Sequence, residues 1–497
     1  MRDYIVAFDQ GTTSSRAVLI DKAGTVRDIS QAPFHQYFPQ PGWVEHDAQE
    51  ILATQLSVFT DLLVRNGLQP SDIDSIGITN QRETTVVWDR NTGQPLCHAI
   101  VWQCRRTAPI VERICADPIV RTRIKETTGL VPDAYFSASK IKWMLDNVPG
   151  ARERAEAGDL LFGTVDCWLV WNLTGGRVHA TDVTNASRTM LFDIHSGTWD
   201  SWLCRLFGIP QDMLPEVRPS SGDFGWTAHP SIAGDIPIRG VAGDQQAALF
   251  GQCCFDAGEA KNTYGTGCFL LMNTGADAVS SQNGLVTSIA ATPPSVDHIE
   301  YVLEGSVFMA GALIQWLVEE AGLVDSVAEV ELLANSVPDA GGVYVVPAFT
   351  GLGAPYWDAQ ARGAIYGLTR GTTRAHIVRA SLESLAYQVN DLIGAMEADS
   401  GMPICALAVD GGASRNDSLM TFQSRLSDVQ VVRPSNTEST AMGAAYLAGL
   451  STGFWKDCDE LRSLRGEGTR FCEHMDPAVR EGLLEGWHRC INRTRMH

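Results

Sequence analysis

The hydrophobic pattern of the chain places the same unit at two distant points. At the first, the apolar run Tyr4–Phe8 gives way to the polar stretch DQGTTSSR, and the apolar run Ala17–Ile20 follows. At the second, AKNTY leads through GTG into CFLLMN, which TGAD closes. An apolar run, a tight turn of glycine and hydroxyl residues, and a returning apolar run predict a β-hairpin. The repeat predicts two similar domains, residues 1–250 and 251–497, that face each other across a cleft.

The rest of the chain alternates strand-like and helix-like segments. SIGITN, TTVVWD and IPIRGVAGD have strand patterns, whereas QEILATQLSVFTDLLVRNG and SASKIKWMLDNV have helix patterns. The segment HIVRASLESLAYQVNDLIGAMEADSG is apolar at helical spacing, and we expect that helix to end at Gly401. A third glycine turn follows in CALAVDGGASRNDSLMTFQSRL, between a predicted strand and a predicted helix. This alternation is typical of α/β architecture.

Composition narrows the class of protein. A length of 497 residues with 44% hydrophobic content exceeds what one core normally spans. Lys and Arg total 38 against 58 Asp and Glu, and the net charge of -20 argues against nucleic acid and anionic membrane surfaces as partners. The 12 cysteines are scattered without a C-x-x-C pair, which favours reduced thiols. No long apolar segment is present, so we expect no membrane insertion and a cytoplasmic location.

The three glycine turns are candidates for binding phosphate. In the first, Gly11 permits close backbone approach, and Thr12, Thr13 and Ser14 add hydroxyl donors. Taken alone, this turn is better explained as an ordinary hairpin turn. Its repetition as YGTG and VDGGASRN at two further strand ends favours a ligand, because open α/β architectures bind ligands there. The chain contains neither a Walker A sequence nor a suitably placed G-x-G-x-x-G, so a nucleotide site would be of another design.

Two aspartates next to these turns have both a chemical and a structural interpretation. Asp9 lies beside hydroxyls suited to phosphate, which favours a bound Mg²⁺ between the acid and the anion. The alternative is a turn aspartate that caps its own backbone. Asp244, after a strand and a glycine, is either the general base of a phosphoryl transfer or a helix N-cap.

The segment GITNQRETTVVWD raises a similar choice for a pair of opposite charges. Arg82 and Glu83 suit adjacent hydroxyls of a polyol, and a surface ion pair is the alternative. Trp102 and Phe269 are candidate apolar walls for carbon faces, although single aromatic residues more often belong to the core.

Thirteen motifs in chain order resemble the FGGY carbohydrate kinases. They include FDQGTTSSR, GITNQRETT, IVWQCRRT, GVAGDQQAALFGQ, NTYGTGCF, FTGLGAPYWD, VDGGASRN and AMGAAYLAGL, and the likeness runs from about Tyr4 to about Trp455. The motifs expected to contact the polyol are similar to those of members that act on glycerol. The resemblance implies the fold shared with actin and hexokinase, which is two duplicated ribonuclease-H-like domains with the nucleotide in the cleft. It also implies transfer of phosphate from ATP to glycerol, giving sn-glycerol 3-phosphate, with Mg²⁺ as cofactor.

The same resemblance implies roles for individual residues. The nucleotide set comprises Thr12, Thr13, Ser14, Arg16, Thr266, Gly311, Gln315, Gly412 and Asn416. The glycerol set comprises Arg82, Glu83, Tyr135, Asp244 and Gln245, with Trp102 and Phe269 against the carbon face. Asp244 matches the general base, and Asp9 matches the acid associated with the metal.

Regulation and assembly are expected to differ among such proteins. The segment GWTAHPSIAGDIPIRG lacks the Gly-Gly-Thr-Arg element with which some members bind fructose 1,6-bisphosphate, and His229 within it is interpreted as an ordinary surface histidine. The segment FCEHMDPAVREG lacks the family's glutamate-containing site for a sugar-transport regulator. A homodimer or homotetramer is implied by the resemblance alone. Two other functions stay open, a kinase of another small polyol or ketose and a catalytically silent, actin-like nucleotide switch.

Overall fold

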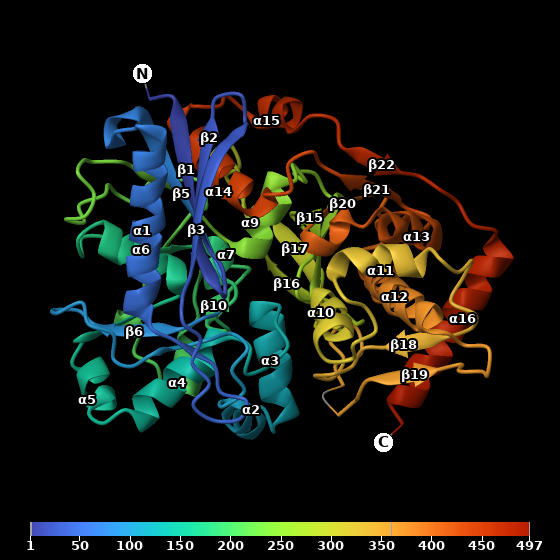
Figure 1. Cartoon of the computed structure of the whole chain (residues 1–497). Helices are drawn as coiled ribbons and strands as arrows, with labels where there is room; N and C mark the ends of the chain where they lie inside the picture. Colours follow the sequence, from blue (N-terminus) through green and yellow to red (C-terminus); the bar gives the residue numbers. More distant parts are fainter. Residues whose placement is uncertain (1, 359, 497) are drawn as a thin grey trace.

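The computed structural model describes residues 2–358 and 360–496, which form two mixed β-sheets joined by helices (Figure 1). The strand order of the first sheet is β13-β5-β1-β2-β3. The central strand β1 pairs antiparallel with β2 and parallel with β5, while β13 runs parallel to β5. These strands are β1 (Tyr4–Gln10), β2 (Ser14–Asp21), β3 (Val26–Pro33), β5 (Ile73–Asn80) and β13 (Ile238–Gly243).

The second sheet repeats this arrangement in the other half of the chain. Its order is β16-β17-β15-β14-β20-β21-β22, and β14 pairs antiparallel with β15 and parallel with β20. The five inner strands β17-β15-β14-β20-β21 therefore correspond to β3-β2-β1-β5-β13, which confirms the predicted duplication. The strands are β14 (Ala260–Tyr264), β15 (Cys268–Gly275), β16 (Val286–Ile289), β17 (Tyr301–Val307), β20 (Ala406–Asp410), β21 (Gln430–Arg433) and β22 (Thr469–Phe471).

Helices cover both faces of each sheet. On the first sheet, α1 (Ala48–Asn66) and α6 (Val165–Leu173) enclose one hydrophobic core, and α14 (Ser439–Thr452) packs on the opposite face. On the second sheet, α12 (Arg374–Ser400) covers one face and α9 (Asp244–Gly251) the other. Figure 1 shows α9 and α14 between the two sheets. Because α14 belongs to the second half in sequence but packs on the first sheet, the two halves share a core.

The remaining elements connect these layers. The helices are α2 (Ala108–Ile114), α3 (Pro118–Thr128), α4 (Ser137–Asn147), α5 (Ala151–Glu156), α7 (Val183–Ala186), α8 (Ser201–Phe207), α10 (Gly311–Glu319), α11 (Val327–Ala334), α13 (Asp417–Ser427), α15 (Cys458–Arg465) and α16 (Pro477–Thr494). The 3₁₀ turns are η1 (Pro70–Asp72), η2 (Gln211–Met213) and η3 (Gly412–Arg415). The short strands are β4 (Glu45–His46), β6 (Val86–Asp89), β7 (Ala99–Ile100), β8 (Leu160–Gly163), β9 (Ala180–Asp182), β10 (Phe192–Asp193), β11 (Thr198–Trp199), β12 (Glu216–Arg218), β18 (Tyr344–Val346) and β19 (Ala364–Tyr366).

Two glycines allow α9 and α14 to cross in direct backbone contact. A Cβ atom at Gly443 would lie 1.8 Å from the carbonyl oxygen of Ala247, and one at Gly251 would lie 2.0 Å from that of Ser439. No side chain fits at either point. The helices that join the two halves therefore meet at a contact that only glycine permits.

The helix ends agree with the sequence predictions. The long helix α12 ends at Gly401, whose φ of 70° is left-handed, and α1 ends in the same way at Gly67. Glycine adopts this conformation without the Cβ clash that other residues meet, so it terminates both helices. Within the described ranges, no helix is long and apolar enough to cross a membrane. The 12 cysteines are free thiols.

Candidate active site

The first hairpin carries an acid and a base opposite each other. Asp9 on β1 pairs in register with Arg16 on β2, and their side chains form an ion pair. Arg16 also contacts Glu438, at 2.7 Å between Nη1 and Oε2, just before α14. The predicted alternative, an aspartate capping its own turn, is wrong because the carboxylate accepts from Arg16 on the neighbouring strand. Burial raises the pKa of Asp9, and Arg16 opposes that shift.

The turn of this hairpin is open at its tip. The amide of Gly11 donates to the carbonyl of Ser14 at 3.0 Å, which closes the turn. Thr13 is exposed, while Thr12 and Ser14 are half-buried. The three predicted hydroxyl residues thus surround one short backbone turn, as a phosphate cradle requires.

In the second half, the predicted nucleotide residues gather at one edge of the sheet. The turn of the second hairpin is bonded to the start of α10, since the amide of Gly311 donates to the carbonyl of Gly265 and that of Ala310 to Thr266, both at 2.9 Å. The next strand, β20, runs parallel to β14, so the turn after it lies at the same edge. A Cβ at Gly411, whose φ is 85°, would lie 2.5 Å from the carbonyl oxygen of Tyr264.

The other members of the nucleotide set lie on these elements. Gln315 is exposed on α10, and Gly412 begins η3. The side chain of Asn416 caps α13, because its Oδ1 accepts from the amide of Leu419 at 2.8 Å. Asn416 therefore has a structural role whether or not it contacts a ligand.

The segment that carries Arg82 and Glu83 is buried, so the surface ion pair proposed as an alternative is wrong. Arg82 is 2% exposed and Glu83 is 1% exposed. The segment also lies against the first hairpin, since the amide of Gln81 donates to the carbonyl of Gln10 at 2.7 Å and its side chain to that of Gly11 at 3.2 Å. Glu83 has a φ of 51°, a left-handed conformation that is uncommon outside glycine and often marks functional sites.

Two further charges that the sequence did not indicate complete a buried cluster. Glu304 on β17 accepts two hydrogen bonds from Arg82, at 2.6 and 2.9 Å. Arg188, after α7, contacts Glu83 at 2.7 Å and Glu304 at 3.2 Å. Glu304 comes from the second half of the chain and the other three from the first, so this cluster joins the two halves. In the sequence, Glu304 could have been singled out because it is an isolated glutamate within the apolar run YVLEGSV.

The cluster is balanced in charge, which explains why it can be buried. Burial alone would raise the pKa of Glu304, but Arg188 and Arg82 together lower it to about 2. Glu83 keeps a raised pKa because its burial outweighs the attraction of Arg188 and Arg82. Two guanidinium groups and two carboxylates with good geometry offset one another's desolvation.

Asp244 lies beside this cluster, at the first residue of α9. Gly243 is the N-cap, so the predicted N-cap role of Asp244 is wrong. Its side chain is 33% exposed, and Oδ1 lies 3.2 Å from Nε of Arg82. The amide and side chain of Gln245 donate to the same carboxylate at 2.8 and 3.2 Å. Burial raises the pKa of Asp244, and Arg82 is the main opposing group.

Aromatic side chains flank these polar groups. The indole N–H of Trp102 donates to the hydroxyl of Thr12 at 3.1 Å, which links this wall to the first turn. Trp102 and Tyr135 pack edge to face with ring centroids 5.5 Å apart. The ammonium of Lys140 donates to the carbonyl of Ala134 at 2.7 Å and also to that of Tyr135, and so holds this segment in place.

Phe269 is placed differently from the other aromatic residues. It lies on β15 opposite Thr263 and packs beside the small core that includes Leu249 and Leu271. Within the described part of the chain, no ring contact joins it to Trp102 or Tyr135. Its assignment to the substrate wall stays a prediction.

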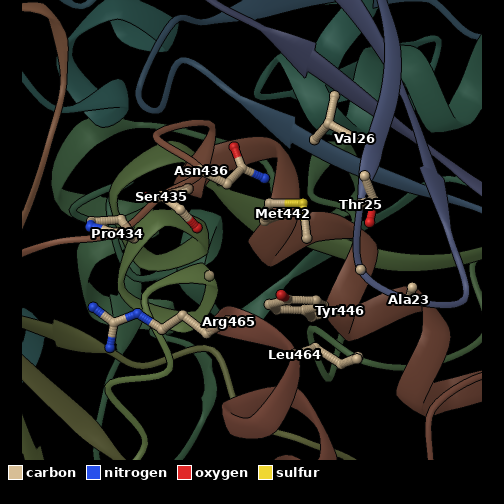
Figure 2. A pocket seen from close by; sticks show the side chains of 13 residues that line it. Ala23, Thr25, Val26, Pro434, Ser435, Asn436, Met442, Tyr446, Leu464 and Arg465 are labelled. Atoms are coloured by element: carbon tan, nitrogen blue, oxygen red, sulfur yellow. The ribbon is translucent and has the colours of Figure 1, made fainter. Parts of the chain in front are cut away.

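A cavity of about 340 Å³ is lined by residues from both halves of the chain, outside the site described above (Figure 2). Its walls come from the β2–β3 turn, the segment before α14, α14 itself and α15. They include Thr25, Asn436, Tyr446 and Arg465. The cavity contains none of the predicted nucleotide or substrate residues, so the candidate active site is located by its side chains and not by this cavity.

Comparison with known proteins identifies the family. The family models of the N-terminal and C-terminal domains of the FGGY family of carbohydrate kinases match residues 4–251 and 260–452. The chain is 58% identical over 497 residues to a glycerol kinase from Symbiobacterium thermophilum, with 99% of each chain covered. It is 57% identical over 496 residues to one from Carboxydothermus hydrogenoformans, covering 99% of this chain and 98% of that one.

Solved structures agree with this assignment. The structure of Plasmodium falciparum glycerol kinase with ADP has a TM-score of 0.93 and 37% identity, with 99% of this chain and 98% of that chain covered. A xylulose kinase from Lactobacillus acidophilus, at 20% identity and a TM-score of 0.88, shares the fold over 99% of this chain and 98% of that chain. The chain belongs to the FGGY family of carbohydrate kinases.

Proposed function

We propose that this protein transfers the terminal phosphoryl group of ATP to glycerol, giving sn-glycerol 3-phosphate. The observation that carries the proposal is a group of polar side chains that lie together, mostly buried, beside the first glycine turn. This group comprises Arg82, Glu83, Asp244 and Gln245. Relatives at 57–58% identity that are named glycerol kinase support the choice of acceptor.

Each polar group can form a hydrogen bond with a hydroxyl of a small polyol. The contacts of Glu83 with Arg188 and Arg82 use Oε1, so Oε2 can accept from a substrate hydroxyl. Asp244 is exposed enough to reach a second hydroxyl, and Gln245 can bond a neighbouring one. Trp102 and Tyr135 enclose the carbon chain and exclude water. A three-carbon triol fits this alternation of polar and apolar contacts.

The proposed reaction is an in-line displacement at the γ-phosphorus. Asp244 accepts the proton of the terminal hydroxyl as the hydroxyl oxygen bonds to the γ-phosphorus, the bond from that phosphorus to the β–γ bridging oxygen breaks, and ADP leaves. The turns at Thr12 and Thr266 hold the phosphate oxygens. Arg82 keeps Asp244 oriented through its Nε contact at 3.2 Å. Positioning and preorganised charge supply most of the rate acceleration in such transfers.

Asp9 is the residue that would hold Mg²⁺ with the nucleotide. Asp9 is 3% exposed and lies next to the hydroxyl-rich turn, and Mg²⁺ commonly binds one or two carboxylates together with substrate phosphates and water. The described residues contain no group of three acids or other metal ligands, which is consistent with a metal brought in by the nucleotide. When bound, Mg²⁺ neutralises charge on the phosphates. Without Mg²⁺, the positive charge of Arg16 would balance the negative charge of Asp9.

A coupled assay for ADP release tests the proposed function. Glycerol, dihydroxyacetone, erythritol, D-xylulose and D-gluconate are compared as acceptors with ATP and Mg²⁺. We expect kcat/KM for glycerol to exceed that for the pentulose and gluconate by about 100-fold or more, because unpaired buried polar groups penalise the wrong acceptor. A preference for another of the five acceptors would identify that compound, and not glycerol, as the substrate. The absence of turnover with all five would favour a catalytically silent nucleotide switch.

The base is tested by Asp244→Asn. We expect this variant to bind ATP normally and to lose glycerol phosphorylation by about three orders of magnitude or more, since the amide cannot accept the proton. Nucleotide binding measured by calorimetry is the control for folding. Turnover close to that of the unmodified enzyme would show that Asp244 is not the base.

We also retain three proposals that concern the whole molecule. The domain boundary that we propose near residue 250 lies at the end of α9, where the range matched by the N-terminal family model also ends. The cytoplasmic location and the homodimer or homotetramer stay predictions.

A further inference from the structure

A buried lysine lies next to the proposed base. Lys261 on β14 is 0% exposed, and in the sheet it pairs with Leu271 on β15 and Ala408 on β20. Burying an ammonium group costs several kcal/mol unless its charge is compensated. A lysine at this position therefore needs an explanation in its contacts.

The direct partners of Lys261 are both neutral. Its Nζ donates to Oε1 of Gln245 at 2.6 Å and to Oγ1 of Thr263 at 2.8 Å. Among the residues that the structure describes, no carboxylate forms an ion pair with it. The ammonium is thus hydrogen-bonded to one hydroxyl and to one amide side chain, that of Gln245.

This contact decides which way the amide of Gln245 faces. An ammonium group has only donors, so the oxygen Oε1 must face Lys261. The nitrogen Nε2 then faces Asp244 and donates to Oδ2 at 3.2 Å. The flipped amide would set donor against donor at Lys261 and acceptor against acceptor at Asp244. Lys261 therefore excludes one of the two orientations.

The orientation determines the hydrogen bonds of Asp244. Its carboxylate accepts from the amide of Gln245, from Nε2 of the same residue, and lies 3.2 Å from Nε of Arg82. All three donors favour the ionised form, in which the carboxylate can take a proton. The charge of Lys261 also favours the ionised form directly, Glu304 on β17 acts against it, and Asp410 on β20 attracts Lys261.

We propose that Lys261 is a positioning residue that fixes the amide of Gln245 and thereby keeps Asp244 ionised and ready to accept the hydroxyl proton. The inference rests on the proposed function and deepens it. Lys261 itself does not need to contact the substrate. The chain of action runs from Lys261 through Gln245 to Asp244.

The test compares pH profiles of kcat. In Lys261→Met, Gln245 is free to flip, and we expect the acidic limb of the profile to move upward by about one pH unit or more. The loss in kcat should then approach tenfold on the acidic limb and should largely vanish at high pH. The KM for ATP should not change. A merely structural role would lower kcat at all pH values without moving the limb, and that outcome would overturn the proposal.

A second variant leaves Lys261 in place. In Gln245→Glu, one carboxylate oxygen still meets Lys261, but the other presents an acceptor to Asp244, so the acidic limb should again move upward. Lys261→Arg keeps a donor and should retain a limb nearer to that of the unmodified enzyme. In Gln245→Leu, adding Lys261→Met should move the limb less than Lys261→Met does in the unmodified enzyme, because only the direct attraction between Lys261 and Asp244 is then left to lose.

The outcomes separate the two proposals. An unmodified enzyme without glycerol-dependent turnover would refute the proposed function. An active unmodified enzyme, together with an unmoved limb in Gln245→Glu, would refute the role of Lys261 alone. If Lys261→Met does not fold, as judged by circular dichroism, Gln245→Glu still decides, because it leaves Lys261 in place.

Discussion

The two hairpins of the molecule share one plan but are held in place by different forces. In the first, the position two residues before the turn glycine is Asp9, which is paired across the strands with Arg16. In the second, the corresponding position is Thr263, opposite Phe269, and the turn carries no charge. The first turn is fastened by an ion pair, whereas the second is fastened by backbone contacts to α10.

The space around the two turns differs in the same way. A Cβ at Gly11 would meet only the carbonyl oxygen of Ser14, at an ordinary 3.4 Å. The corresponding Gly265 is equally open, with its nearest neighbour at 3.7 Å, but a Cβ at Gly267, which takes the place of Ser14, would lie 2.2 Å from the carbonyl oxygen of Val307. The second hairpin has no charged side chain two residues before its turn glycine, but the neighbouring strand β17 carries Glu304, which belongs to the buried cluster. The two hairpins therefore share one topology but differ in their charges and in their packing.

The largest effect is expected from removing the charge beside the second hairpin. Glu304→Gln leaves Arg82 and Arg188 undercompensated in the interior, and we expect a loss of about 3–5 kcal/mol in the free energy of unfolding at neutral pH. Because the pKa of Glu304 is about 2 when folded against an ordinary 4.5, its contribution is complete above pH 4.5 and is lost as the pH falls toward 2. Denaturation midpoints of both proteins, measured from neutral to acidic pH, should converge. A constant gap would contradict this account.

The matching change in the first hairpin should affect activity more than stability. Asp9→Asn removes the acid proposed for Mg²⁺, and we expect kcat/KM to fall by about two to three orders of magnitude. The Mg²⁺ concentration needed for half-maximal rate should rise. Thr263→Ser, at the corresponding position of the second hairpin, keeps its hydroxyl and is the matched control. Normal Mg²⁺ dependence in Asp9→Asn would exclude the metal role.

The packing difference predicts that alanine is tolerated at Gly11 in the first turn and not at Gly267 in the second. Gly267→Ala forces the hairpin away from β17 and should destabilise the protein by about 1–3 kcal/mol, as overpacking usually does. Gly11→Ala meets no obstacle and should change the unfolding midpoint little. Thermal unfolding of the two variants side by side gives the answer, and equal losses would show that the turns are packed alike.

The smallest effect concerns the contact between the first turn and the aromatic wall. Thr12→Val removes the acceptor of the Trp102 indole, a bond whose net contribution is typically about 0.5–1.5 kcal/mol. We expect the KM for glycerol to rise roughly two- to tenfold, in addition to any loss in kcat from the phosphate oxygens that the same turn is proposed to hold. Thr12→Ser retains the hydroxyl and should behave like the unmodified enzyme. A fall in kcat alone would assign Thr12 to the phosphate instead.

The sequence predicted both hairpins and the end of α12 because their signals are local. The partners of Arg82 and Glu83 could not be predicted, since Glu304 lies 222 residues away from Arg82 and only the fold brings them together. The same holds for α14, which is apolar on all sides, so its pattern does not tell which sheet it covers. The roles of Arg188 and Lys261 were missed because single charged residues in apolar segments carry no spacing pattern.

The crossing of α9 and α14 at Gly251 and Gly443 sets how closely the two sheets approach each other. At the crossing point the backbones of the two helices lie directly against each other, and the side chains around it pack in one core. A single methyl group at residue 443 would push the two helices apart, and with them the two sheets on which they pack.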